Sequence, residues 1–274
     1  MAAVSLSGPV ASLDSEPAAA PSGGWLRLAW RAPALGLWVL GGLAWVLLIH
    51  HRLPASSQRW VVRAFARGVL LWCGVRLEPE IRGPAQPRAL VPHPALVVAN
   101  HVSWIDIYVA HALEPMTFIA KADIARWPVL GRLVTAARTV YIERGNRQAI
   151  RGVIEAVEAR FDAGERVMFF PEGTTSDGLS LLPFHSNLFV VVANRPGLPV
   201  VPLTLQYWQA GRPSSRAAYV GEMTLVGSMV QIMRSRGLVA RPIVHPPIPG
   251  AQQMDRRALA AHAQEVIGQS MASC

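Results

Sequence analysis

Near the N-terminus, the hydrophobic positions of the chain form one uninterrupted segment instead of a periodic pattern. Every residue from Ala34 to Ile49 is apolar or glycine. Because a helix that crosses a bilayer needs roughly 20 such residues, this segment predicts either a short crossing helix or one that enters a single leaflet. A buried helix of a soluble protein is the alternative. Residues 1–24 are rich in Ala, Ser, Pro and Gly without periodicity, and they predict a disordered leader.

Residues 58–73 have the pattern of an amphipathic helix. Arg59, Arg63 and Arg67 recur every four residues and form a basic stripe, whereas apolar side chains recur at helical spacing on another face. Such a helix can lie in the headgroup plane of an anionic membrane. The alternative is a helix that packs on the protein with its arginines in solvent.

After residue 74 the pattern changes to short apolar segments that alternate with amphipathic ones. The predicted strands are residues 75–82, interrupted at Pro79, and residues 95–99, 167–170, 200–205 and 239–244. The predicted helices are residues 146–162, residues 224–234 and one that begins at Asp255. This alternation predicts an α/β fold with a mixed, largely parallel sheet flanked by helices. We therefore divide the chain into a leader (1–24), a membrane-docking helical segment (25–73) and one α/β domain (74–274).

Composition and charge narrow the class of partner. Charged residues make up 16% of the chain, against about 25% in an ordinary soluble domain. The formal net charge is +9, which favours an anionic membrane surface as a partner. No nucleic-acid-binding motif is present, so we expect no nucleic-acid partner. Two cysteines fit a reducing compartment, and the arginines that follow the apolar segment predict a domain on the cytoplasmic face of the inner membrane.

A histidine and an aspartate follow the buried strand predicted at residues 95–99. That strand runs directly into the segment NHVSWID at residues 100–106. In a strand-to-helix turn, Ser103 can cap the helix and Asp106 falls in its first turn, within reach of His101. The carboxylate then fixes the imidazole tautomer, and the other ring nitrogen can act as a general base. Neither a Gly-x-Ser-x-Gly elbow nor a closely spaced metal-ligand motif occurs, so we expect neither an α/β-hydrolase nor a metal-dependent hydrolase.

Three further segments follow in order: VYIER at residues 140–144, FFPEGTT at 169–175 and VVPL at 200–203. Together with the His-x4-Asp pair, they resemble the four motifs of the glycerolipid acyltransferase family, typified by bacterial 1-acyl-glycerol-3-phosphate acyltransferase. The resemblance covers roughly residues 74–249. It implies an acyltransferase domain that acylates the sn-2 hydroxyl of lysophosphatidic acid in phospholipid biosynthesis. The implied donor is acyl-CoA or acyl-ACP, and no cofactor is implied.

The resemblance also implies roles for individual residues. His101 and Asp106 match the catalytic pair of the family. Lys121, the only lysine among the 26 basic residues, matches a lysine associated with phosphate binding. The other matches to substrate-binding positions are Arg144, Glu172, Gly173, Thr174 and Pro202. We expect Glu172 to bind acceptor hydroxyls and to orient its loop.

The chain departs from the family pattern at Thr175, where the family often has an arginine. Lys121, Arg144 and Arg147 then remain as candidate ligands of a phosphate. Family members with this variant include enzymes that acylate lyso-ornithine lipid, whose acceptor has no phosphate, so lyso-ornithine lipid or another lysolipid is the alternative acceptor. We expect His185 at the surface or behind the site. The alternative of another class is a non-catalytic membrane lipid-binding protein. Acyl carrier protein is a further candidate partner.

Overall fold

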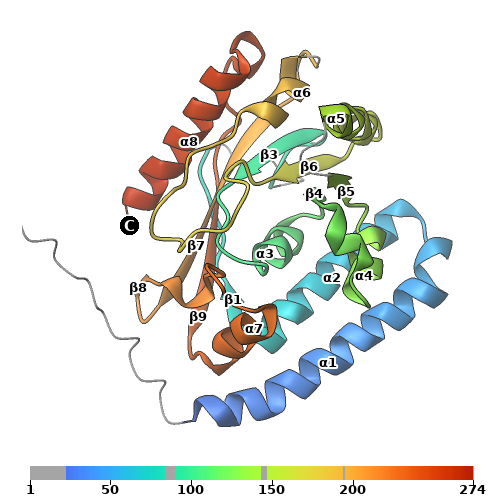
Figure 1. Ribbon diagram of the computed structural model, residues 1–274, viewed down its shortest axis with the longest axis vertical. Coiled ribbons are helices and arrows are strands. Elements are labelled where there is room, and N and C mark those ends of the chain that lie inside the picture. The colour runs from blue at the N-terminus through green and yellow to red at the C-terminus, as the bar shows by residue number, and fades with distance from the viewer. Residues whose placement is uncertain (1–22, 84–89, 143–146, 194, 274) are drawn as a thin grey trace, which may run out of the picture.

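The computed structural model describes residues 23–83, 90–142, 147–193 and 195–273, and a nine-stranded sheet runs through its centre (Figure 1). The strands are β1 (Val75–Leu77), β2 (Glu80–Ile81), β3 (Ala95–Ala99), β4 (Thr117–Lys121), β5 (Val140–Ile142), β6 (Arg166–Phe169), β7 (Val200–Gln209), β8 (Arg212–Pro213) and β9 (Leu238–Val244). Their order is β1-β9-β7-β3-β6-β4-β5, with β2 beside β9 and β8 beside β7. All pairings are parallel except those of β7 with β8 and β9. The predicted mixed, largely parallel sheet is confirmed.

Helices cover both faces of this sheet (Figure 1). The α-helices are α1 (Gly24–Leu48), α2 (Ala55–Cys73), α3 (Asp106–Leu113), α4 (Leu130–Ala136), α5 (Arg147–Asp162), α6 (Val190–Ala193), α7 (Leu225–Arg234) and α8 (Arg256–Ala272). The short 3₁₀ turns are η1 (His50–Arg52), η2 (Ala122–Arg126), η3 (Asn187–Phe189), η4 (Ser215–Ala217) and η5 (Ala251–Gln253). The helices predicted at 224–234 and after Asp255 are present, whereas β4 and α4 were not predicted. The predicted cap Asn146 and residues 1–22 of the predicted leader lie outside the described residues.

Strand β3 is buried on both faces because side chains alternate along a strand. Ala95, Val97 and Ala99 belong to the core that the sheet forms with α2, α3 and α7. Leu96 and Val98 belong to the core formed with α5, α6 and α8. None of these five residues is more than 1% exposed. Pairing with β6 and β7 also satisfies the backbone of β3, so the turn that follows the strand has a fixed position.

The N-terminal apolar segment forms one helix of 25 residues, longer than the segment predicted at 34–49. Arg27 and Arg31 interrupt the apolar pattern in the sequence, but both side chains bind the end of α7. Arg27 Nε donates to the Arg234 carbonyl at 3.1 Å, and Arg31 Nη1 donates to the Met233 carbonyl at 2.7 Å. The C-terminus of α7 leaves these carbonyls without partners inside that helix, and the two arginines of α1 bind them. Residues 24–33 are therefore held as part of α1, although the continuous apolar segment begins only at Ala34.

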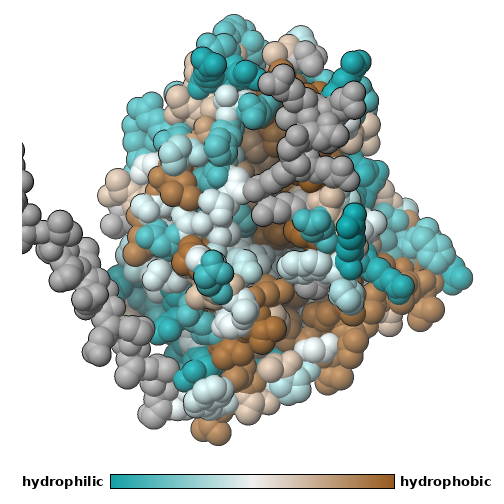
Figure 2. Space-filling view, in the orientation of Figure 1, coloured by the Kyte–Doolittle hydropathy of each residue, from teal (hydrophilic) through white to brown (hydrophobic). Residues whose placement is uncertain are grey.

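Most apolar side chains of α1 point away from the protein. Leu26 is 76% exposed, Leu37 72% and Leu48 63%. Within α1 only Gly24 and Leu35 are buried. Figure 2 shows the hydrophobic surface that results along the lower edge of the molecule, over α1. By length and composition this helix is apolar enough to cross a membrane, and its exposed face is unlike that of a helix from a soluble core.

Helix α2 begins at Ala55 and lies between α1 and α3. Of the predicted basic stripe, Arg63 pairs with Glu114 at 3.1 Å and also donates to the Leu113 carbonyl. Arg67 Nε donates to the Ala112 carbonyl at 3.4 Å. Two of the three arginines therefore bind the C-terminus of α3, where cations are favourable. The expectation of one stripe directed at lipid headgroups is therefore wrong for Arg63, whereas Arg67 remains exposed.

Candidate active site

The His-x4-Asp pair lies in the turn between β3 and α3. Asp106 is the first residue of α3, and its Oδ2 is 2.8 Å from His101 Nδ1. The Asp106 side chain is fully buried, whereas the His101 side chain is 20% exposed. Because Nδ1 is bound to the carboxylate, Nε2 is the ring nitrogen that remains for a substrate.

Four hydrogen bonds hold the carboxylate of Asp106. Besides the imidazole, Oδ2 accepts from the backbone N–H groups of Val102 at 2.7 Å and Ser103 at 2.8 Å. The Tyr207 hydroxyl donates to Oδ1 at 2.6 Å. Burial, with the charge of Asp106 and this hydrogen bond, raises the pKa of Tyr207 well above its usual range, so the hydroxyl stays a donor. A carboxylate held on both oxygens gives the imidazole one orientation.

Two features of this turn differ from the sequence-based expectation. Ser103 does not cap α3, because its hydroxyl is buried without a hydrogen-bond partner in the described part of the chain. Asp106 reaches back to the N–H groups instead, so one carboxylate serves both the turn and the imidazole. Tyr207 was not predicted at all. It lies on β7, about a hundred positions downstream, and its only sequence signal is a phenol that follows a mostly apolar strand segment.

Glu172 joins this turn to the loop that follows β6. Its Oε1 accepts from the backbone N–H of His101 at 2.7 Å, and its Oε2 accepts from that of Leu182 at 3.1 Å. Glu172 is buried, and burial raises the pKa of its carboxyl while the two N–H donors partly oppose that rise. The side chain therefore holds two loops together at the site. Binding of acceptor hydroxyls by Glu172 stays a prediction.

An aromatic ring covers one face of the His101 imidazole. The ring of Phe170 stacks on it with the centroids 3.9 Å apart and the planes at 10°. The ring centroids of Phe118, in β4, and Phe170 are 6.2 Å apart. The backbone N–H of Ser176 donates to the His101 carbonyl at 2.7 Å, which closes the loop onto the turn. Phe170 belongs to the FFPEGTT segment, but no role was predicted for it.

Gly173 and Thr174, the other predicted residues of the FFPEGTT loop, directly follow Glu172. Gly173 has a φ of 68°, a conformation that favours glycine, and Thr174 is exposed. The Thr175 hydroxyl donates to the Tyr219 carbonyl. The backbone N–H of Tyr219 in turn donates to the Val102 carbonyl at 3.0 Å. Thr175 thus connects the loop, through Tyr219, to the turn that carries His101 and Asp106, and it supplies no positive charge.

The remaining predicted residues are dispersed. Pro202 is buried within β7 opposite Val98 of β3, so it lies inside the sheet rather than at the mouth of the site. Lys121 is the last residue of β4 and pairs through its backbone with Ile142 of β5. Arg144 lies outside the described residues. His185 is exposed, as expected, and its backbone N–H donates to the Pro171 carbonyl at 2.9 Å.

This arrangement can remove a proton from a bound hydroxyl. Nε2 of an oriented imidazole accepts the proton, and the carboxylate on Nδ1 stabilises the resulting cation. Among the described residues no serine or cysteine side chain is hydrogen-bonded to the imidazole, so the geometry suits a nucleophile that the substrate supplies. Within that same part of the chain, no group of three His, Cys, Asp or Glu side chains is placed to hold a metal ion.

Comparison with known proteins places the chain in a family. Residues 80–206 match the model of the Acyltransferase family. The chain is 36% identical over 247 residues to the lyso-ornithine lipid O-acyltransferase of Pseudomonas aeruginosa, which covers 88% of this chain and 92% of that protein. It is also 36% identical over 215 residues to the 1-acyl-sn-glycerol-3-phosphate acyltransferase of Neisseria meningitidis, which covers 78% of this chain and 81% of that protein.

A solved structure shows the same fold. The crystal structure of the 1-acyl-sn-glycerophosphate acyltransferase PlsC from Thermotoga maritima matches with a TM-score of 0.64 at 19% sequence identity. The match covers 91% of this chain and 95% of that one. The chain therefore belongs to the Acyltransferase family, and it is an acyltransferase of the lysophospholipid and lysolipid type.

Proposed function

We propose that this enzyme transfers a fatty acyl group from acyl-CoA or acyl-ACP to the sn-2 hydroxyl of lysophosphatidic acid. The observation that carries the proposal is the contact between the buried Asp106 carboxylate and His101 Nδ1, which leaves Nε2 as a general base. The name of the Neisseria meningitidis relative supports this acceptor. No cofactor takes part in the proposed reaction.

The proposed mechanism needs no nucleophile from the protein. Nε2 of His101 takes the proton of the acceptor hydroxyl as that oxygen attacks the thioester carbonyl. The new C–O bond forms, the tetrahedral intermediate collapses, and the C–S bond breaks to release the thiolate of the donor, which takes the proton back from His101 to leave as the thiol. Asp106 stabilises the imidazolium throughout, while the stacked ring of Phe170 limits rotation of the imidazole.

Lys121 and Arg144 are proposed to bind the phosphate of the acceptor. Lys121 ends β4 beside Ile142, the last residue of β5, and β4 and β5 are parallel to β3 through β6. The carboxyl ends of these strands therefore lie at the same edge of the sheet as His101, where α/β folds bind ligands. Glu172, Gly173 and Thr174 are proposed to contact the acceptor from the loop after β6.

Lyso-ornithine lipid is the second candidate acceptor, and the contact of Thr175 favours it. The Thr175 hydroxyl donates to the Tyr219 carbonyl, so this loop offers no cation at the position where the family often has arginine. The name of the Pseudomonas aeruginosa relative supports the same acceptor. The two candidate acceptors differ in headgroup charge, so the enzyme should bind them unequally, and the values of kcat/KM for the two lipids distinguish them.

We also propose that α1 docks the enzyme on the cytoplasmic face of the inner membrane. The exposed apolar face of α1 supports this proposal, as does the formal charge of +9. A basic protein is attracted to anionic lipids, and an exposed apolar helix then enters the interface.

A panel of acceptors with purified full-length protein tests these proposals. Labelled acyl-CoA and acyl-ACP are each offered with lysophosphatidic acid and with lyso-ornithine lipid, and His101→Ala serves as the inactive control. A higher kcat/KM for lysophosphatidic acid supports the first acceptor, and a higher value for lyso-ornithine lipid supports the second. Transfer to neither lipid by folded protein contradicts both.

A further inference from the structure

The loop between η2 and α4 carries a tryptophan at the surface. Trp127 is 43% exposed, and within the described part of the chain its ring stacks on no other aromatic ring and its indole N–H has no hydrogen-bond partner. Its backbone N–H donates to the Ile124 carbonyl at 3.1 Å, and its carbonyl accepts from Gly131 at 2.9 Å. A Cβ added at Gly131 would lie 2.3 Å from the Ala125 carbonyl oxygen, so the two ends of the loop are in close contact. A closed turn therefore presents the indole at the surface.

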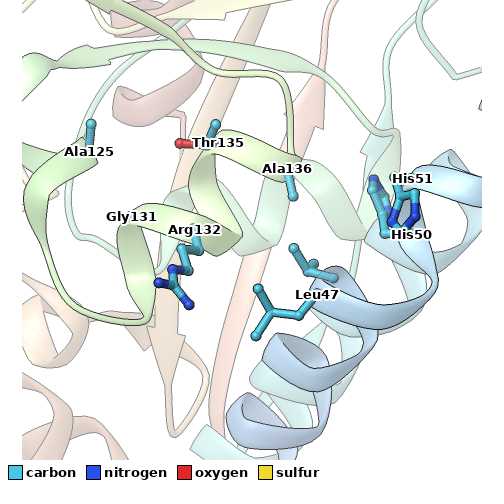
Figure 3. Close-up of a pocket in the computed structure, with 9 residues that line it drawn as sticks. Leu47, His50, His51, Ala125, Gly131, Arg132, Thr135 and Ala136 are labelled. Atoms are coloured by element: carbon cyan, nitrogen blue, oxygen red, sulfur yellow. The ribbon is translucent and has the colours of Figure 1, made fainter.

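This loop adjoins the end of the membrane helix α1. Ala125 and Gly131, at the two ends of the loop, border the same shallow depression as Val46 and Leu47 of α1. Figure 3 shows the loop beside the last turns of α1, with Leu47 between them. Leu47 is 49% exposed and Leu48 63%. The exposed apolar face of α1 thus continues up to this loop, and a lipid surface that covers the end of α1 also meets the loop.

Two arginines flank the exposed tryptophan. Arg126 and Arg132 are both exposed, and neither forms an ion pair with any described residue. Arg132 extends away from the histidines of η1 (Figure 3), so it is not directed into the depression. Residues 122–136 contain one acidic residue, Asp123. An indole has an apolar body and a polar N–H, which suits the headgroup level of a membrane, and arginines beside it are attracted to anionic lipids.

We propose that the loop between η2 and α4 is a second membrane contact, at which Trp127 enters the interface of an anionic lipid monolayer between Arg126 and Arg132. This inference rests on the proposed docking by α1 and adds a contact outside that helix. Because η2 directly follows β4, which ends at Lys121, the contact would bring the catalytic edge of the sheet to the level of the headgroups. An acceptor lipid would then reach that edge without leaving the monolayer. Continuity with the apolar face of α1 favours a lipid surface over an acidic protein as the partner.

The depth of the loop is measured with single fluorescent probes on the full-length protein. In a Cys274→Ser background, where Cys73 is buried, the variants Trp127→Cys, Leu37→Cys and Arg256→Cys each carry one NBD fluorophore. Position 37 reports the exposed face of α1, and position 256 begins α8 at the opposite end of the molecule (Figure 1). Vesicles of equal parts phosphatidylglycerol and phosphatidylcholine contain a lipid spin-labelled on its acyl chain, which quenches a probe that enters the membrane. We expect quenching at positions 127 and 37 and none at position 256.

Binding to the same vesicles at physiological ionic strength tests the side chains themselves. Arg126→Gln/Arg132→Gln should weaken binding at least about tenfold, because each arginine near an anionic surface contributes to it. Trp127→Ser should weaken binding about tenfold, since the apolar surface of the indole is lost from the interface. Arg256→Gln/Arg257→Gln is the matched control: it removes the same charge from exposed positions at the opposite end of the molecule, where salt screens the effect, and it should bind as the wild type does. Thermal melts check that each variant is folded.

The outcomes separate this contact from the docking of α1. Quenching at position 37 without quenching at position 127 would overturn the second contact and leave docking by α1 intact. Quenching at neither position would overturn the proposed docking and this inference with it. Wild-type binding of vesicles by Arg126→Gln/Arg132→Gln would also overturn it. If that variant then lost turnover with acyl-ACP but not with acyl-CoA, the loop would be a surface for the carrier protein instead.

Discussion

Strand β3 and helix α1 are both apolar in sequence, but they bury their side chains in different surroundings. Every residue of β3 is at most 1% exposed inside the protein, with a helical layer on each face. Helix α1 has a mean hydropathy of 1.5 over its most apolar part, yet only 6% of that part is buried. Two apolar segments thus leave water in different ways. The side chains of β3 are covered by helices of the same protein, whereas those of α1 need a lipid surface to cover them.

The two regions are therefore expected to control different properties: β3 positions the residues of the transfer reaction, and α1 binds the enzyme to the membrane. The rigid strand holds His101 and Asp106 at its end, so changes there should lower the rate without moving the enzyme off the membrane. Among the described residues, no hydrogen bond or ring contact of His101 or Asp106 involves α1, so changes in that helix should release the enzyme without altering the chemical step. Experiments that measure both turnover and membrane binding show whether each region affects only one of the two properties.

The largest expected effect is that of His101→Ala, which should lower kcat by about 10²–10⁴-fold because the general base is lost. Asp106→Asn should also lower kcat severely, since an amide can present the wrong group to Nδ1. Steady-state transfer of labelled acyl-CoA measures both. Flotation with vesicles is the control, and it should give wild-type binding. Near-normal turnover in folded His101→Ala would refute the assigned mechanism.

The second effect concerns α1. Leu37 is 72% exposed and Leu40 57%, and they lie one helical turn apart. Leu37→Ser/Leu40→Ser should weaken binding to vesicles by about 3 kcal/mol, because two leucine side chains no longer leave water. Leu179→Ser is the matched control, since Leu179 is 54% exposed in a loop far from α1 along the chain. Turnover in detergent micelles should stay at the wild-type value in both, and an unchanged partition of the α1 variant would contradict membrane docking by this face.

The third effect belongs to the acceptor side of the site. Lys121→Met or Arg144→Met should raise the KM for lysophosphatidic acid at a cost of about 1.5–3 kcal/mol, the value of a charge-assisted hydrogen bond. The KM for the acyl donor should change little, because the thioester occupies a different part of the site. If the KM for lysophosphatidic acid and the kcat of both variants equal those of the wild type, these two residues do not bind the phosphate. Lyso-ornithine lipid then becomes the favoured acceptor.

The smallest effect is expected from Tyr207→Phe. Tyr207 is a positioning residue, because it touches Asp106 and not the imidazole. Loss of its hydrogen bond should lower kcat about tenfold. The carboxylate would also direct more of its charge at the imidazole, so the acidic limb of the kcat/KM profile should move to higher pH. A purely structural role would lower stability and leave that limb in place, which a thermal melt and the pH profile distinguish.

The sequence predicted the parts of the fold that local patterns determine. Strand β3, the helix after it and the position of Asp106 in the first turn followed from an apolar segment, a turn and spacing. Tyr207 could not be predicted, because its contact depends on β7 pairing beside β3 across about a hundred residues. The functions of Arg27 and Arg31 were likewise invisible, since both depend on carbonyls at the end of α7. Local periodicity carries no information about such distant partners.

The attachment of α1 along the protein has a consequence for membrane topology. Arg27 and Arg31 bind α7, the Trp38 indole donates to the Phe65 carbonyl at 3.0 Å, and the end of the helix packs on α4. A helix fastened to its own domain at both ends and in the middle cannot extend away from it as an isolated transmembrane rod. We therefore expect a monotopic enzyme, inserted in one monolayer, that takes up lysolipid and releases the diacyl product on the same side of the bilayer. Movement of that product to the opposite monolayer would then require a separate flippase.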